Sequence, residues 1–99
     1  MNDIKQTAEF RAWRASLDAA VAERVRARLT RFQSGNPGDV EPVGGDVFEM
    51  RIHAGSGYRM YYTRVGRVAY LMLVGGIKRS QKGDIMRAQD MAAALRGKR

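Results

Sequence analysis

Residues 48–64 constrain the fold more than any other stretch, because side chains alternate in character on both sides of a short glycine-containing turn. The first arm reads Phe48-Glu49-Met50-Arg51-Ile52-His53, and the second reads Tyr58-Arg59-Met60-Tyr61-Tyr62-Thr63. Ala-Gly-Ser-Gly at 54–57 supplies the permissive backbone that a tight reversal needs. Successive side chains of a strand point to opposite faces, so the pattern predicts a β-hairpin. If the two apolar sets share one face, the other face carries Arg51, His53, Arg59 and Tyr61.

Two amphipathic helices are predicted before the hairpin, each starting at a residue that can cap a helix. Thr7 is the first cap, and the apolar positions that follow it are Phe10, Trp13 and Leu17. Asp18 is the second cap, and the apolar positions of its helix are Val21, Val25, Leu29 and Phe32. Gly, Asn and Pro within 34–39 then end the second helix.

The remaining segments predict two more strands and a third helix. A short edge strand is expected at 40–43, and a central strand at 67–74, where apolar residues occupy both faces. Ser80 can cap a last helix, whose buried stripe is Ile85, Ala88, Ala92 and Leu95. The expected fold is a single α+β domain over 1–99, with two N-terminal helices, a three- or four-stranded antiparallel sheet and a C-terminal helix. The first two helices should cover the apolar hairpin face, and the third only part of the opposite face.

Composition narrows the class of function. The 99 residues include 18 Lys and Arg against 10 Asp and Glu, a formal net charge of +8, which favours a polyanionic partner. There is no cysteine and one histidine, so a zinc centre is not expected, and neither is any other metal or cofactor. The apolar run at 68–74 is too short to span a bilayer, and the expected location is the cytoplasm.

The polar face of the hairpin carries groups suited to phosphates and bases. Guanidinium groups bind phosphate through paired hydrogen bonds and keep their charge, so Arg51 and Arg59 are candidate phosphate ligands. Imidazole titrates near neutral pH, which makes His53 the best proton-transfer candidate on general grounds, although its place beside the turn favours a structural or substrate-positioning role. Tyr61 and Gln81 are candidates for contacts with a base or a sugar.

A basic stripe is predicted on the second helix, because Arg24, Arg28 and Arg31 follow the i, i+4, i+7 spacing. Such a stripe is usually a solvated face, and in a protein that enters the ribosome it could also bind ribosomal RNA phosphates. Lys98 and Arg99, in a tail expected to fray, would add to the same attraction.

Five short motifs together resemble a known family. They are Glu-Phe-Arg-x-Trp at 9–13, Gly35-Asn36-x-Gly38-Asp39, Phe48-Glu49-x-Arg51, Gly55-x-Gly57-Tyr58-Arg59-x-Tyr61-Tyr62 and Gly75-Gly76-x-Lys78-x-x-Gln81-x-x-Asp84-Ile85. Their order and spacing, almost end to end, resemble the RelE/ParE superfamily of type II toxin-antitoxin toxins. The likeness is to its HigB-like, phage-derived "addiction module killer protein" branch.

The resemblance implies a toxin that cleaves translated mRNA on the ribosome without a metal, as many members do. It also implies a cognate antitoxin, commonly a helix-turn-helix protein encoded next to the toxin. A ParE-like inhibitor of DNA gyrase and a non-toxic RNA-binding relative are the alternatives.

Residue by residue, the resemblance implies basic groups around the scissile phosphate at Arg51, Arg59 and Lys78, with Arg79 as the adjacent alternative to Lys78. Glu49 stands where RelE-like nucleases carry a lysine, and we expect it to orient an arginine.

Overall fold

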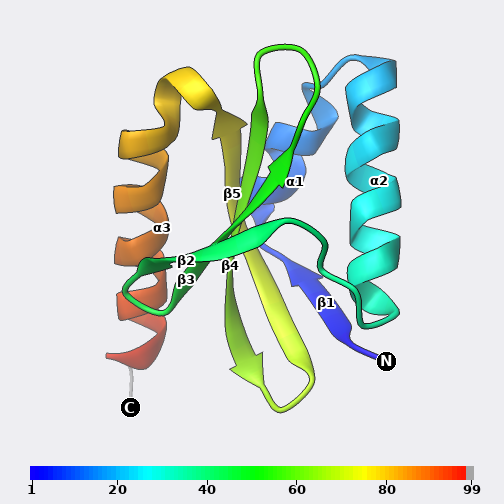
Figure 1. The fold of residues 1–99 in the computed structure, drawn as a ribbon. Helices are drawn as coiled ribbons and strands as arrows, with labels where there is room; N and C mark the ends of the chain where they lie inside the picture. The colour runs from blue at the N-terminus through cyan, green and yellow to red at the C-terminus, as the bar shows by residue number, and fades with distance from the viewer. Residues whose placement is uncertain (98–99) are drawn as a thin grey trace.

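Five strands form one sheet in the order β1-β5-β4-β3-β2, with helices on both faces (Figure 1). The computed structural model describes residues 1–97. The strands are β1 (Asp3–Gln6), β2 (Val40–Gly44), β3 (Val47–Ile52), β4 (Tyr58–Gly66) and β5 (Ala69–Ile77). The helices are α1 (Ala8–Ala15), α2 (Ala19–Gln33) and α3 (Gln81–Arg96), and a 3₁₀ turn, η1 (Lys78–Ser80), precedes α3. The α+β class predicted from the sequence is confirmed.

The observed sheet differs from the expected one because it includes β1. This strand pairs in parallel with β5, whereas the other neighbours are antiparallel, so the sheet is mixed and has five strands rather than three or four. Residues 3–6 include a single apolar side chain, Ile4, so they lack the alternation that marks a strand. Their strand conformation depends on pairing with residues 69–72, which lie far away in the sequence.

The two predicted N-terminal helices are present, and both predicted caps are confirmed. The Thr7 hydroxyl accepts a hydrogen bond from the Phe10 N–H at 2.9 Å, and the Asp18 carboxylate accepts one from the Val21 N–H at 3.0 Å. The same Thr7 hydroxyl donates to the Leu73 carbonyl at 2.7 Å, which joins the start of α1 to β5.

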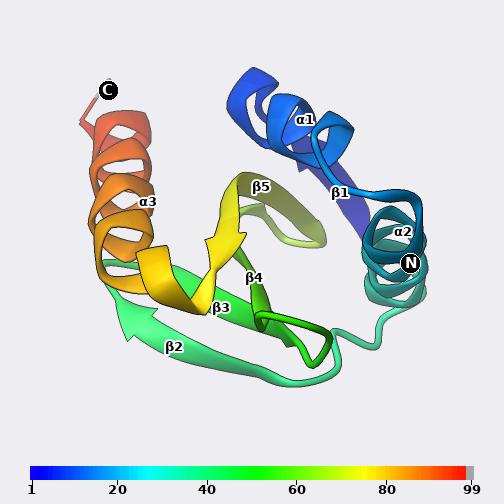
Figure 2. The same cartoon turned by 90° about the horizontal axis from the view of Figure 1, so that it is seen from above.

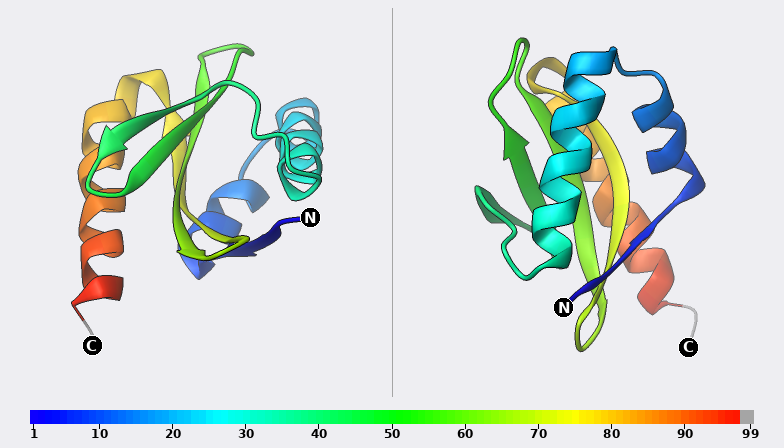
Figure 3. Two further views of the ribbon diagram at one scale, coloured as in Figure 1. Left: turned by 60° about the horizontal axis from the view of Figure 1, so that its bottom comes forward. Right: turned by 90° about the vertical axis from the view of Figure 1, so that its right-hand side faces the viewer.

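The sheet has an apolar core on each face, because α1 and α2 cover one face and α3 covers the other (Figure 2). The core under α1 and α2 consists of Phe10, Val21, Val25, Leu29, Phe32, Met50, Ile52, Met60, Tyr62 and Met72. The core under α3 consists of Val47, Tyr61, Leu73, Val74, Ala88 and Ala92. Figure 3 shows α2 along one face and α3 behind the other. The predicted assignment of helices to sheet faces is therefore confirmed.

Helix α3 differs from the prediction at both ends. The Ser80 side chain makes no capping hydrogen bond to the helix, and its hydroxyl instead bonds to Asp84 Oδ2 at 2.6 Å. Ala88 and Ala92 are buried as expected, but Leu95 is 42% exposed beside Val65 and Arg64. The expected tail at Lys98 and Arg99 lies outside the described residues. Within residues 1–97 no helix is both long and apolar enough to cross a membrane.

Candidate active site

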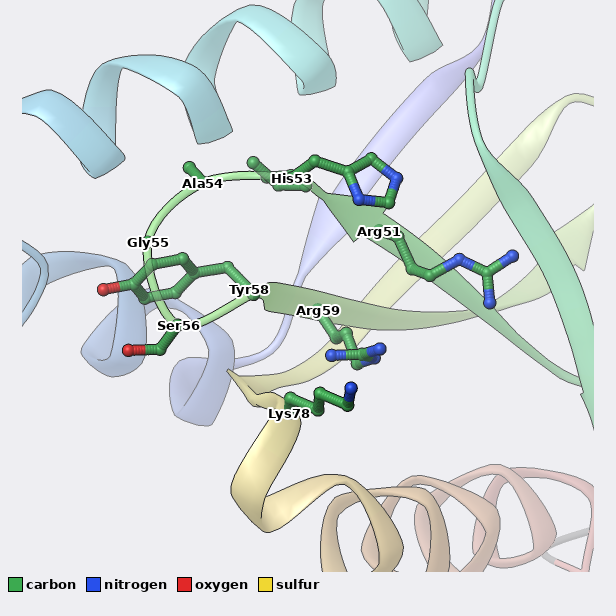
Figure 4. Close-up of a pocket in the computed structure, with 10 residues that line it drawn as sticks. Arg51, His53, Ala54, Gly55, Ser56, Tyr58, Arg59 and Lys78 are labelled. Carbon is green, nitrogen blue, oxygen red and sulfur yellow. The ribbon is translucent and has the colours of Figure 1, made fainter.

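A hollow of about 430 Å³ opens at the end of the β3–β4 hairpin, next to the turn that leads into α3 (Figure 4). We call it the hairpin hollow. It is lined by Arg51, Ile52, His53, Ala54, Gly55, Ser56, Gly57, Tyr58, Arg59 and Lys78. The three side chains predicted to lie around the phosphate and the proton-transfer candidate His53 therefore line one space, and Lys78, not the neighbouring Arg79, is the lining residue. Their catalytic roles stay a prediction.

Arg59 and Lys78 present their charged ends side by side in the hairpin hollow (Figure 4). Within residues 1–97, Lys78 Nζ and the terminal amino groups of Arg59 form no hydrogen bond. Gly57 holds the two residues close, since its carbonyl accepts from the Lys78 N–H at 2.9 Å. Its φ of +77° is in the left-handed region that favours glycine, and a Cβ there would lie 3.4 Å from Arg59 Nη1. The site thus contains two cations with donors available for an anion.

Glu49 lies beneath these cations as a buried carboxylate, with 1% of its side chain exposed. Oε1 accepts from Arg51 Nη1 at 3.1 Å, and Oε2 accepts from Tyr61 Oη at 3.0 Å. Oε2 also accepts from Gln81 Nε2 at 2.8 Å, and it lies 3.5 Å from Arg59 Nε. A buried charge is stable only when paired and hydrogen-bonded, and these four groups meet that need. The expectation that Glu49 orients an arginine fits this geometry.

Arg51 is enclosed by three acidic side chains, of which sequence reasoning missed Asp39 and Glu41. Its Nη2 lies 3.2 Å from Asp39 Oδ1 and 2.6 Å from Glu41 Oε1, in addition to its bond to Glu49. Hydrogen bonds to Asp39 and then Glu41 raise the pKa of Arg51 well above its ordinary value. Arg51 is therefore a charged but largely occupied group. It pairs with Arg59 across the hairpin, so two arginines in register have different surroundings.

Asp39 links Arg51 to His53. Its Oδ2 lies 2.8 Å from His53 Nε2, and hydrogen bonds from Arg51 and then His53 lower the pKa of Asp39 to about 2. The carboxylate is thus ionised at neutral pH and can fix the orientation of the imidazole. His53 itself is 77% exposed, so the face of its ring that Asp39 does not contact is open to solvent. We call Asp39, Glu41 and Glu49, with Arg51, His53, Tyr61 and Gln81, the carboxylate network.

Two predicted contacts with a base or a sugar are not supported by the geometry. Tyr61 is fully buried under α3, and its hydroxyl is used by Glu49, so its ring is closed to a base. Burial, followed by the nearby charge of Glu49, raises the pKa of Tyr61 above its ordinary value. Gln81 likewise donates its amide to Glu49. The half-buried ring of Tyr58 packs against the core under α1 and α2 and also lines the hairpin hollow.

The three arginines of the predicted basic stripe on α2 have different surroundings in the structure. Arg28 is half-buried, and it donates to the carbonyls of Arg51 and Pro37, the latter at 2.9 Å. It therefore ties α2 to β3 and to the loop before β2 and is not placed to bind RNA. A Cβ at Gly38, whose φ is +79°, would lie 2.8 Å from Arg28 Nη2. Arg24 and Arg31 are exposed.

Sequence reasoning missed Asp39 and Glu41 as partners of Arg51, because the strand pairing that brings them together joins residues that are distant in the sequence. Asp39 ends the Gly35-Asn36-x-Gly38-Asp39 motif, and this position was the available signal. Glu41 faces Arg51 because β2 pairs with β3, a contact that a short edge strand does not reveal. Within residues 1–97, no group of three or more His, Cys, Asp or Glu side chains is arranged to hold a metal ion.

Comparison with known proteins adds both sequence and fold relatives. The family described as "Phage derived protein Gp49-like (DUF891)" matches residues 12–97. A protein of Haemophilus influenzae, described as uncharacterized, is 39% identical over 93 residues, which cover 93% of this chain and 94% of that protein.

Two solved structures share the fold at low sequence identity. The isolated E. coli RelE toxin aligns with a TM-score of 0.66 and 15% identity, over 88% of this chain and 98% of that chain. A chain of the intact E. coli RelBE toxin-antitoxin complex aligns with a TM-score of 0.61 and 16% identity, over 78% of this chain and 96% of that chain. The resemblance predicted from the motifs is confirmed.

Proposed function

The chain belongs to the Gp49-like family of phage-derived proteins, and from this premise we propose that it is the toxin of a type II toxin-antitoxin system. In this proposal it cleaves translated mRNA on the ribosome, without a metal or cofactor, and thereby stops translation and growth in the cytoplasm. The observation that carries the proposal is the shared hairpin hollow, where Arg59 and Lys78 have donors available beside His53 and Arg51.

The proposed reaction uses the 2′-hydroxyl of RNA as the nucleophile. Its oxygen attacks the adjacent phosphorus while the bond to the 5′-oxygen of the next nucleotide breaks, giving a cyclic phosphate and a free 5′-hydroxyl. Arg59 and Lys78 stabilise the added negative charge on the phosphate, which is the largest contribution that such a site can make. Guanidinium groups keep their proton, so they do not act as bases.

His53 is the proposed proton-transfer group. An exposed imidazole held through Nε2 by Asp39 can exchange a proton at Nδ1 with the 2′-hydroxyl or with the leaving oxygen. Asp39 then acts as a positioning residue. The ring of Tyr58, which lines the same hollow, is the proposed stacking surface for a base.

A cognate antitoxin is the second proposed partner, and the fold shared with a chain of the RelBE toxin-antitoxin complex supports it. We expect a small protein, commonly of the helix-turn-helix type and encoded next to this chain. Binding over the hairpin hollow would prevent RNA from reaching Arg59 and Lys78. Co-expression of the adjacent reading frame should restore growth.

Induced expression with RNA end mapping tests the function. Wild-type protein should arrest growth and produce codon-phased cuts in translated messages, while R59A should be folded but harmless. The matched control is R26A, since Arg26 is an exposed arginine paired with Glu23 on α2, and it should stay toxic.

Two outcomes would reject the proposal that the protein is a nuclease. Growth arrest with intact messages and a DNA damage response would indicate a gyrase inhibitor. Folded wild-type protein that is harmless would indicate a non-toxic RNA-binding relative.

A further inference from the structure

Helix α2 presents two exposed arginines whose side chains have no hydrogen bond or ion pair within the part of the chain that the structure describes. Arg24 and Arg31 are seven residues apart, which is about two turns and about 10 Å along the helix axis, so they share one side of the helix. By contrast, Arg26 makes a contact with both carboxylate oxygens of Glu23 on the same helix. The positive charge of Arg24 and Arg31 is therefore not balanced by a partner.

These two arginines line a second hollow of about 300 Å³, which we call the helix hollow. Its lining residues are Arg24, Ala27, Arg28, Arg31, Ile52 and His53, none of them acidic. Arg28 contributes charge at the wall but is tied to backbone carbonyls. Burial, and then the positive charge of Arg31, lowers the pKa of Arg28, while the charge of nearby Asp39 opposes this shift.

The helix hollow and the hairpin hollow share Ile52 and His53 as lining residues. The two spaces therefore lie next to each other at the end of β3, where His53 lines both. Cations line both, from Lys78 and Arg59 at one end to Arg24 and Arg31 at the other. A single strand of RNA carries one phosphate per nucleotide and is flexible enough to follow such a path.

We propose that the helix hollow binds further backbone phosphates of the RNA strand whose scissile phosphate occupies the hairpin hollow. Arg24 and Arg31 hold these phosphates, and His53 marks the passage from one hollow to the other. This inference rests on the proposed function and deepens it, because it assigns an extended substrate strand to the site. Ribosomal RNA could supply the same phosphates, and the shared wall at Ile52 and His53 favours the substrate strand.

The length dependence of RNA binding tests the proposal. Fluorescence anisotropy would be measured on the full chain with 2′-O-methyl RNA, which lacks the attacking hydroxyl, as a trinucleotide and as a twelve-nucleotide strand. The double variant R24Q/R31Q should bind the long strand about tenfold more weakly and the trinucleotide as wild type does. Its slope of log affinity against log salt concentration should be shallower by about 0.7 for each phosphate that the variant no longer neutralises, or about 1.4 in all.

The matched control is R26Q/R87Q, which removes the same charge from two exposed arginines that are paired with Glu23 and Glu9. It should leave both affinities within about twofold, and thermal melts should show all variants folded. Equal losses in R24Q/R31Q and R26Q/R87Q would overturn the proposal, because net charge alone would then explain the effect. Weaker ribosome binding with unchanged binding of the long strand would also overturn it and assign the arginines to ribosomal RNA.

The variant R59Q separates this inference from the proposed function. It should weaken binding of both RNA lengths. If R59Q binds both as wild type does, the phosphate site in the hairpin hollow fails, whereas the helix hollow is judged by R24Q/R31Q alone.

Discussion

The carboxylate network and the open side of the hairpin hollow are built on the same two strands, but in opposite ways. In the network, Glu49 is buried and each of its oxygens accepts hydrogen bonds, while Arg51 contacts three carboxylates. On the open side, Lys78 and the terminal amino groups of Arg59 have no such partner within residues 1–97. Paired charges hold the framework, and charges with free donors remain for a ligand. The comparison predicts that changes to the buried members of the network, Glu49 and Tyr61, chiefly lower stability, whereas changes to the open side lower activity.

Breaking the network at Glu49 should have the largest effect. E49A leaves two arginines without their buried counter-charge and Tyr61 Oη without its acceptor, so the free energy of unfolding should fall by about 3–5 kcal/mol. Urea denaturation followed by circular dichroism measures this. E49Q keeps the shape and an acceptor for Tyr61, and its effect should be smaller. If E49A were as stable as wild type, the carboxylate network would not be what stabilises the fold here.

Substitutions of the two paired arginines, Arg59 and Arg51, should reduce the cleavage rate to different extents. R59Q should reduce the cleavage rate about 100-fold to 1000-fold, since it removes a donor that is proposed to stabilise the phosphate. R51Q should reduce the rate less, because the donors of Arg51 already serve carboxylates. Cleavage rates of a defined message in a translation extract compare the two. A larger reduction in R51Q would reverse the proposed roles.

The two tyrosines sharpen the same comparison. Y61F removes a hydrogen bond to a buried carboxylate and should lower the free energy of unfolding by about 1.5–3 kcal/mol, with RNA affinity unchanged. Y58L keeps apolar volume but removes a ring that lines the hairpin hollow, so RNA affinity should fall by about 1–3 kcal/mol. Each variant is the control of the other. Weaker RNA binding in Y61F alone would mean that the buried ring reaches the RNA.

The smallest expected effect is a pH dependence from Asp39. Its pKa is lowered from 3.8 to about 2 in the folded chain, so the unfolded chain takes up the proton first as the pH falls. The resulting stability is complete above about pH 4 and is lost as the pH falls toward about 2. Denaturation curves across this range should therefore show a steeper decline for wild type than for D39N. Equal slopes would mean that Asp39 does not stay bound to Arg51 and His53 in solution.

Local patterns were sufficient for much of the fold and for the position of the site. Alternation placed Arg51 and Arg59 on one face of the hairpin, and capping residues placed the starts of α1 and α2. The partners of these groups were not predictable, because they come from other elements. Tyr61 is closed to a base only because α3 covers it, and Arg51 is occupied only because β2 brings Glu41 beside it. Sequence spacing indicated the position of a charge but not whether a counter-charge already binds it.

Strand β1 has a consequence for how the chain is made. Its residues 3–6 pair with 69–72, and the Thr7 hydroxyl bonds to Leu73, 66 positions further along. During synthesis the first strand thus emerges long before its neighbour exists, and the edge of the sheet is completed only when β5 has left the ribosome. Contacts of such long sequence separation slow folding. The native sheet therefore cannot be completed from local contacts and waits for a segment more than sixty positions along the chain.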